Sequence, residues 1–246
     1  MLFIIRFIML TLAMIVLSIY SIFYCALSPR NPKNTYHFAR LFSKMSWMVG
    51  LKVTYRVPEK AKEYGPAVYI ANHQNSYDML ITTGAVQPKS VTIGKKSLVW
   101  IPLFGLIYWL TGNILIDRDN QKKSKKTIKD VIQKMHDEQI SVWIFPEGTR
   151  SNGKGLLPFK MGAFHTALQA KVNIIATVIS STHQQVKLNR WDNGEVIVEM
   201  LDPIDITQYN KREIRRLMND SHALMLKKYE QLNKEVKRPD NNNCCG

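Results

Sequence analysis

The chain has 246 residues, of which 46% are hydrophobic and 10% aromatic, and this composition excludes an intrinsically disordered protein. Its length suits one sizeable domain with appendages, not two large domains. The 34 lysines and arginines against 19 acidic residues give a net charge of +15, which implies a negatively charged partner: nucleic acid, an anionic membrane surface, or an acidic substrate and its carrier.

The first segment of the chain is apolar. Residues 7–27 contain no charged side chain, and this length is enough for a helix to cross a hydrocarbon core of roughly 30 Å. A cleaved signal peptide fits less well, because the residues before Arg6 are also apolar and no Ala-x-Ala-like site follows the run. The sequence therefore predicts a membrane anchor that is retained.

Basic residues follow this anchor, whereas Arg6 alone precedes it, so the positive-inside rule predicts a cytoplasmic location for the rest of the chain. Apolar residues between Phe38 and Met48 recur at helical spacing and predict a second, amphipathic helix. This helix is expected to lie in the membrane interface or to pair with the first one, which then re-enters one leaflet; the alternative is a helix packed on the domain core. We assign residues 1–50 to the anchor and residues 51–246 to one domain with a C-terminal helix.

The rest of the chain alternates between strand-like and helix-like stretches. Runs rich in β-branched and aromatic residues predict strands at 53–57, 67–71, 90–93, 113–117, 140–145, 173–180 and 195–201. Helical patterns are clearest at 79–86, 122–137, 159–170 and 211–236. The alternation predicts an α/β fold, a mixed sheet flanked by helices, with the two-helix membrane-anchoring segment at its N-terminus.

The eighteen uncharged residues from Val99 to Ile116 are long enough to be considered as a second membrane span. We reject this interpretation because Pro102, Gly105 and Gly112 interrupt the run, and its end is typical of a strand. An aromatic-rich surface that rests in the membrane or lines an acyl-chain slot explains the segment, with a buried core segment as the alternative.

A histidine and an aspartate directly follow the strand predicted at 67–71. A neutral imidazole at His73 can accept a proton from an alcohol near pH 7, and a carboxylate at Asp78 can fix its tautomer and stabilise the imidazolium. Positions five apart on a regular helix point about 140° away from each other, so the two side chains can meet only if a bend or a loose turn lies between them. The pair alone is weak evidence, because it occurs by chance in many chains.

A second polar loop, Pro146 to Ser151, follows the strand predicted at 140–145. Its glycine, hydroxyl and arginine residues suit a phosphate pocket, because they offer close backbone amides, extra donors and a planar guanidinium. Glu147 would repel phosphate, so we expect it to pair with Arg150 or another base. An ordinary turn with a surface ion pair is the alternative for this loop alone.

Five motifs occur in a fixed order: NHQNSYD, GKKSLVWIPLFG, GNILIDR, FPEGTRS and LLPFKMGAF. With them, the region from Leu51 to Leu201 resembles the glycerolipid acyltransferase superfamily. Within that superfamily it is very similar to the bacterial enzymes that acylate 1-acyl-glycerol 3-phosphate. The resemblance implies that His73 and Asp78 are the catalytic pair. It also implies that Glu147, Gly148, Thr149 and Arg150 bind the glycerol phosphate. Lys95 and Arg118 match basic positions that help to hold the phosphate, although sequence alone does not separate Lys95 from Lys96.

The resemblance further implies transfer of a fatty acyl group from acyl carrier protein or coenzyme A to the sn-2 hydroxyl of lysophosphatidate, in phospholipid biosynthesis. No cofactor is expected, and the thioester is a co-substrate. The expected location is the bacterial inner membrane, in contact with its lipids, with the catalytic domain on the cytoplasmic side. The family's fourth block usually carries two prolines, which are missing from residues 172–176 of this chain.

Several alternatives remain at this stage. Sister enzymes acylate glycerol 3-phosphate or other lyso-lipids with the same pair, and a thioesterase would use it to activate water, although the chain has no Gly-x-Ser-x-Gly elbow. A basic membrane-binding protein is suggested by five lysines between residues 122 and 129. Nucleic-acid binding is not expected, because no helix-turn-helix, zinc or aromatic RNA-binding pattern occurs. No metal-ligand spacing occurs among the histidines and the cysteines Cys25, Cys244 and Cys245. The positions of the three cysteines suggest no disulfide framework, which favours a reducing compartment.

Overall fold

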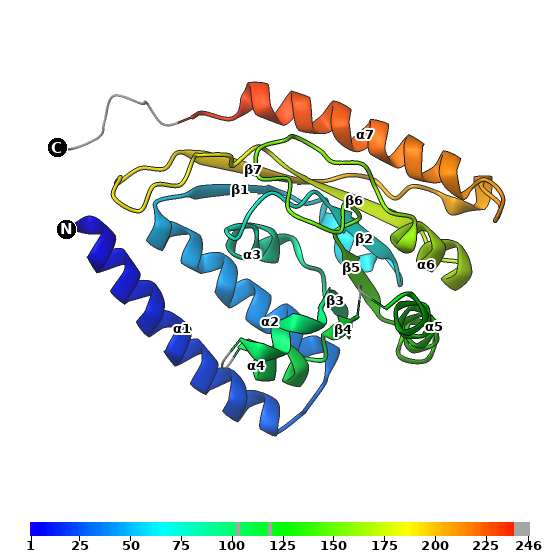
Figure 1. The fold of residues 1–246 in the computed structure, drawn as a ribbon, viewed down its shortest axis with the longest axis horizontal. Helices are drawn as coiled ribbons and strands as arrows, with labels where there is room; N and C mark the ends of the chain where they lie inside the picture. The colour runs from blue at the N-terminus through cyan, green and yellow to red at the C-terminus, as the bar shows by residue number, and fades with distance from the viewer. Residues whose placement is uncertain (102–103, 118–119, 239–246) are drawn as a thin grey trace.

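The computed structural model describes residues 1–101, 104–117 and 120–238, and within them one seven-stranded mixed sheet forms the centre of the molecule (Figure 1). The strands are β1 (Lys52–Arg56), β2 (Val68–Ala71), β3 (Ser90–Lys95), β4 (Ile114–Ile116), β5 (Ser141–Ile144), β6 (Ile174–Ile179) and β7 (Glu195–Met200). Their order in the sheet is β1-β7-β6-β2-β5-β3-β4. All neighbouring pairs are parallel except β6 and β7, which are antiparallel. The seven predicted strands and the mixed sheet are confirmed.

Helices cover both faces of this sheet. The α-helices are α1 (Leu2–Ala26), α2 (Pro32–Ser43), α3 (Asp78–Ile81), α4 (Phe104–Leu110), α5 (Gln121–Glu138), α6 (Gly162–Ala170) and α7 (Ile214–Glu235). The 3₁₀ helices are η1 (Lys44–Val49), η2 (Glu59–Glu63), η3 (Thr82–Ala85), η4 (Lys96–Trp100) and η5 (Ile206–Gln208). The four predicted helical stretches in the domain are therefore found, the first of them as α3 followed by η3.

Alternating residues of the central strands point to two separate cores. In β2, Val68 and Ile70 face the core under α5, α6 and α7, whereas Tyr69 and Ala71 face the core under α2, η1 and α3. All four residues are fully or almost fully buried. Parallel strands covered on both faces have near-continuous apolar sequences, which is why these strands were visible in the sequence.

Helix α1 packs along the domain with most of its polar side chains inward. Among the described helices it is the one long and apolar enough to cross a membrane. Arg6, Ser18, Ser21 and Cys25 are buried against the domain, while the apolar side chains from Phe3 to Phe23 are mostly exposed. The guanidinium of Arg6 donates to backbone carbonyls of the 188–191 loop, including that of Trp191 at 2.7 Å. This inverted pattern leaves an unusually apolar outer surface.

Helix α2 lies between α1 and the sheet (Figure 1) and packs on the domain. Asn31 caps its first turn by accepting a hydrogen bond from the backbone N–H of Lys33 at 3.0 Å, and Pro32 opens it. Ala39 is 6% exposed and packs in the core, whereas Phe38 is 3% exposed and contacts the rings of Tyr20 and Tyr24 of α1. Helix α2 therefore both packs on the domain and pairs with α1, and contact with the membrane interface stays a prediction.

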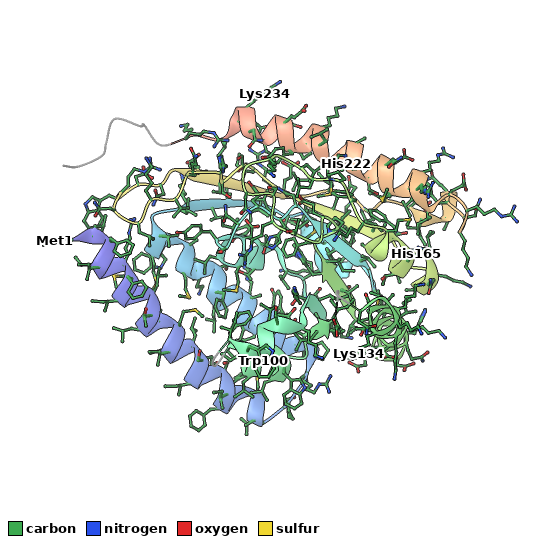
Figure 2. All side chains as sticks on the ribbon, viewed as in Figure 1. Met1, Trp100, Lys134, His165, His222 and Lys234 are labelled. Carbon is green, nitrogen blue, oxygen red and sulfur yellow. The ribbon has the colours of Figure 1, made fainter. Side chains whose placement is uncertain are left out.

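The apolar stretch from Val99 to Ile116 is not a single helix. It contains the end of η4, helix α4 and strand β4, which confirms that it is not a membrane span, while Pro102 lies outside the described residues. Val99, Trp100, Ile101, Leu106 and Trp109 are exposed. Trp100 lies near α4 on the side of the molecule that carries α1, whereas Lys134 of α5 lies away from α1 (Figure 2).

Candidate active site

Three neighbouring parallel strands end at the same edge of the sheet and supply the polar loops of the candidate site. Strand β5 lies between β2 and β3, with Val142 opposite both Val68 and Val91. Continued along the strands, this register places His73, at the end of β2, level with Glu147, at the end of β5. The carboxyl edge of an open α/β sheet is where ligands bind.

His73 and Asp78 meet across a turn that is not helical. Residues 72–77 precede the helix, and Asp78 is the first residue of α3, so the expected loose turn is confirmed. The imidazole Nδ1 of His73 lies 2.7 Å from Oδ2 of Asp78. The same oxygen accepts hydrogen bonds from the backbone N–H groups of Gln74 at 2.5 Å and Asn75 at 3.1 Å. Because a carboxylate only accepts, Nδ1 carries the proton, and the lone pair of Nε2 is left for a substrate.

The ring of His73 is held in place and remains accessible. It stacks on Phe145, with the ring centroids 4.2 Å apart and an interplanar angle of 21°. Its side chain is 22% exposed, whereas that of Asp78 is 1% exposed. A partly exposed base oriented by a buried carboxylate is the arrangement needed for general-base catalysis.

Glu147 does not pair with Arg150, and that expectation is wrong. Its side chain is 2% exposed, and Oε1 accepts the backbone N–H of His73 at 2.6 Å while Oε2 accepts that of Leu157 at 3.0 Å. Two orphan amides in a buried loop satisfy the carboxylate better than an exposed guanidinium can, because they are rigid and already desolvated. Glu147 therefore positions the backbone of His73.

Burial raises the pKa of Glu147 to about 6, although the amides of His73 and Leu157 act in the opposite direction. The folded protein thus binds this proton more tightly than the unfolded chain, so stability from this group is full below the ordinary value of 4.5 and is lost as the pH rises through about 6. We expect the unfolding free energy of the wild type, relative to Glu147→Gln, to fall by about 2 kcal/mol between pH 4 and pH 7. Denaturation midpoints of both proteins in detergent at several pH values measure this; a constant difference would contradict it.

The loop from Glu147 to Ser151 brackets His73 from a second side. The backbone N–H of Ser151 donates to the carbonyl of His73 at 2.8 Å, and that of Asn152 donates to the carbonyl of Gln74 at 3.0 Å. Thr149 and Arg150 are exposed. Among the described residues, no carboxylate lies within ion-pair distance of Arg150. The structure thus brings the two predicted motifs together and leaves a cation beside the imidazole loop.

The other basic residues expected to hold the phosphate are Lys95 or Lys96 and Arg118. Lys95 is the last residue of β3 and is exposed at the same sheet edge. Lys96 begins η4, and its Nζ lies 3.9 Å from Oδ2 of Asp117, so Asp117 partly offsets its charge. Both lysines lie at this edge of the sheet, and the choice between Lys95 and Lys96 stays a prediction. Arg118 lies outside the described residues.

The end of β6 also contacts the His73 loop, through side chains that the sequence analysis did not single out. Asn72 exchanges two hydrogen bonds with the backbone of Ile179, at 2.8 and 2.9 Å. Gln74 donates to the carbonyl of Ser180 at 2.9 Å and accepts from the N–H of Thr182 at 2.8 Å. Both amide side chains are buried, so they fix the His73 loop to the neighbouring strand.

A metal centre finds no ligand set in the part of the chain that the structure describes. No group of three or more His, Cys, Asp or Glu side chains there is able to hold an ion.

Comparisons with known proteins point to one family. The acyltransferase family model matches residues 52–180. The 1-acyl-sn-glycerol-3-phosphate acyltransferases of Salmonella typhimurium and Escherichia coli are 51% and 50% identical over 236 residues, which are 96% of this chain and 96% of each of theirs. The alpha form from Homo sapiens is 31% identical over 218 residues, 88% of this chain and 77% of its own. A solved acyltransferase from Thermotoga maritima covers 94% of both chains with a TM-score of 0.76 at 20% identity, which shows a shared fold.

Proposed function

The chain belongs to the acyltransferase family, and from this premise we propose that it transfers a fatty acyl group from a thioester to the sn-2 hydroxyl of 1-acyl-sn-glycerol 3-phosphate, giving phosphatidate. The observation that carries the proposal is the contact of His73 with Asp78 beside the loop that bears Arg150. This arrangement unites a base for a hydroxyl with a cation for a phosphate. The names of the relatives supply the substrate.

We infer a direct transfer with His73 as the base. Nε2 takes the proton of the acceptor hydroxyl as its oxygen attacks the thioester carbonyl, and Asp78 stabilises the imidazolium that forms. The C–S bond then breaks, and the departing thiolate takes that proton, so the products are an ester and a free thiol. The acyl group passes directly between the substrates, without an acyl-enzyme, because the acceptor hydroxyl is the nucleophile and His73 is the base that activates it.

The donor in this proposal is a thioester of acyl carrier protein or of coenzyme A. Both carry negative charge, and the net charge of +15 favours their approach. The lysines of the first half of α5 are exposed on a helix that begins shortly after β4, at the same edge of the sheet as the candidate site; they are Lys122, Lys123, Lys125, Lys126 and Lys129.

Arg150 is proposed to bind the phosphate of the acceptor. Replacement by alanine removes a planar, bidentate partner, and charge-assisted hydrogen bonds are worth about 1.5–3 kcal/mol. We expect Arg150→Ala to raise the KM for lysophosphatidate by roughly 10- to 100-fold, with a smaller change for Arg150→Lys. Steady-state kinetics with varied acceptor at saturating thioester measures this effect, and an unchanged KM would remove Arg150 from the pocket.

We further propose that residues 1–50 attach the domain to the inner membrane, with the site facing the cytoplasm. The exposed apolar face of α1 and the exposed aromatic residues Trp100 and Trp109 support membrane contact on one side of the molecule. Helix α1 is buried against the domain near both ends, at Arg6 and at Cys25, which supports a helix lying in one leaflet over one that crosses it.

A single assay tests the proposed function. Membranes containing the protein, washed with high salt, receive labelled acyl thioester and a panel of acceptors: lysophosphatidate, glycerol 3-phosphate and other lyso-lipids. Phosphatidate formed in the pellet is the expected product in mass spectrometry. Free fatty acid formed equally with and without acceptor would instead indicate a thioesterase, and a different acylated acceptor would identify a sister activity.

A further inference from the structure

Lys160 lies against the same loop as Arg150 and is unused by the mechanism above. It follows Phe159, which is buried and stacks on Phe164 with centroids 6.1 Å apart. The backbone N–H of Lys160 donates to the carbonyl of Pro146 at 2.8 Å. These two anchors fix the start of the side chain beside the end of β5, although the residue itself is exposed.

The side chain of Lys160 covers Gly148. A Cβ atom at Gly148 would lie 2.9 Å from both Cδ and Nζ of Lys160, so the absence of a side chain at position 148 makes room for the ammonium. Gly148 also has a φ of +70°, a conformation that side-chain-bearing residues rarely adopt. The glycine thus permits both the turn and the close approach of Lys160 to the loop.

The charge of Lys160 is not neutralised within the described residues. No carboxylate there lies within ion-pair distance of its Nζ, even though Glu147 directly precedes Gly148, the residue that Lys160 covers. Glu147 already uses both oxygens on the amides of His73 and Leu157. The ammonium of Lys160 thus lies against the loop that carries Arg150 and is hydrogen-bonded to the backbone of His73, and two cations on one loop suit a dianion.

We infer that Lys160 is a further substrate-binding residue, whose ammonium contacts the phosphate of lysophosphatidate together with Arg150. This inference rests on the proposed function and adds a ligand to the phosphate site that resemblance did not assign. Gly148 and the buried Glu147 then each support one part of the site. Glycine admits the lysine, and the glutamate holds the His73 loop at the position where the bound acceptor presents its hydroxyl.

Kinetics of Lys160→Gln and Lys160→Arg test the inference. We expect Lys160→Gln to raise the KM for lysophosphatidate at least tenfold, with the KM for the acyl thioester and the thermal midpoint unchanged, because only the acceptor carries the phosphate in question. Lys160→Arg keeps the charge and should restore the acceptor KM to within a few-fold of wild type. Lys227→Gln, an exposed lysine of α7 with no role in the site, is the matched control.

Two results would overturn the inference. One is an acceptor KM for Lys160→Gln within twofold of wild type. The other is an equal rise of both KM values together with a lower thermal midpoint, which would indicate a structural lysine. Failure of the proposed function is separate, because it would show as absence of phosphatidate formation by the wild type and by Lys227→Gln.

Discussion

Replacement of His73 by alanine is expected to lower kcat for acyl transfer by roughly 10²- to 10⁴-fold, the usual contribution of a positioned general base. The reason lies in the geometry: Nδ1 is occupied by Asp78, so Nε2 is the ring atom left to accept the hydroxyl proton. The ring stacks on one face of Phe145 and is partly exposed, so its loss should alter the surroundings little. Phosphatidate formation under saturating substrates is the measurement.

The matched control is His165→Ala. His165 is exposed on α6, and Figure 2 shows it at the end of the molecule away from α1. This variant should keep wild-type activity, and both variants should keep the thermal midpoint and remain in the membrane fraction. Near-normal turnover of His73→Ala would rule out the base role, and the site would then have to act through the cations alone.

The strands and the contact between His73 and Asp78 could be predicted from the sequence, because both depend on residues that lie close together along the chain. β6, Ile174 to Ile179, is apolar except for Thr177, and it is buried on both faces. His73 and Asp78 lie five residues apart, so one loose turn brings them into contact. Strand β6 forms although residues 172–176 lack the two prolines of the family's fourth block, as its pairing with β2 shows.

The contact of Glu147 with His73 could not be predicted in the same way, because it depends on the order of strands in the sheet. Glu147 reaches the amide of His73 only because β5 is the direct neighbour of β2, 74 residues away along the chain. Local patterns give the strands but not their neighbours. The same holds for Asn72, whose partner Ile179 lies 107 residues away. The resemblance assigns Glu147 to the phosphate, and this role stays a prediction beside its observed contacts with the backbone of His73 and Leu157.

Replacement of Asp78 by asparagine is expected to be nearly as damaging as loss of the base. In the wild type, Oδ2 accepts three hydrogen bonds, from Nδ1 of His73 and from the N–H groups of Gln74 and Asn75. An asparagine can offer its oxygen to the same donors, but it brings no negative charge to the imidazolium. We expect kcat to fall by roughly 10²-fold or more, with the KM for lysophosphatidate little changed, because the phosphate ligands lie on another loop.

A second effect adds to the first in the same variant. The other oxygen of Asp78, Oδ1, is buried and has no hydrogen-bond partner in the described part of the chain. In Asp78→Asn, an unsatisfied amide N–H₂ group takes the position of Oδ1; if the side chain flips, the N–H₂ group instead takes the position of Oδ2 and faces the groups from which Oδ2 accepted. An unsatisfied buried donor costs about 1–3 kcal/mol, so the thermal midpoint should also fall. Full activity in Asp78→Asn would show that the carboxylate serves only to shape the turn, since a neutral side chain of the same size would then suffice.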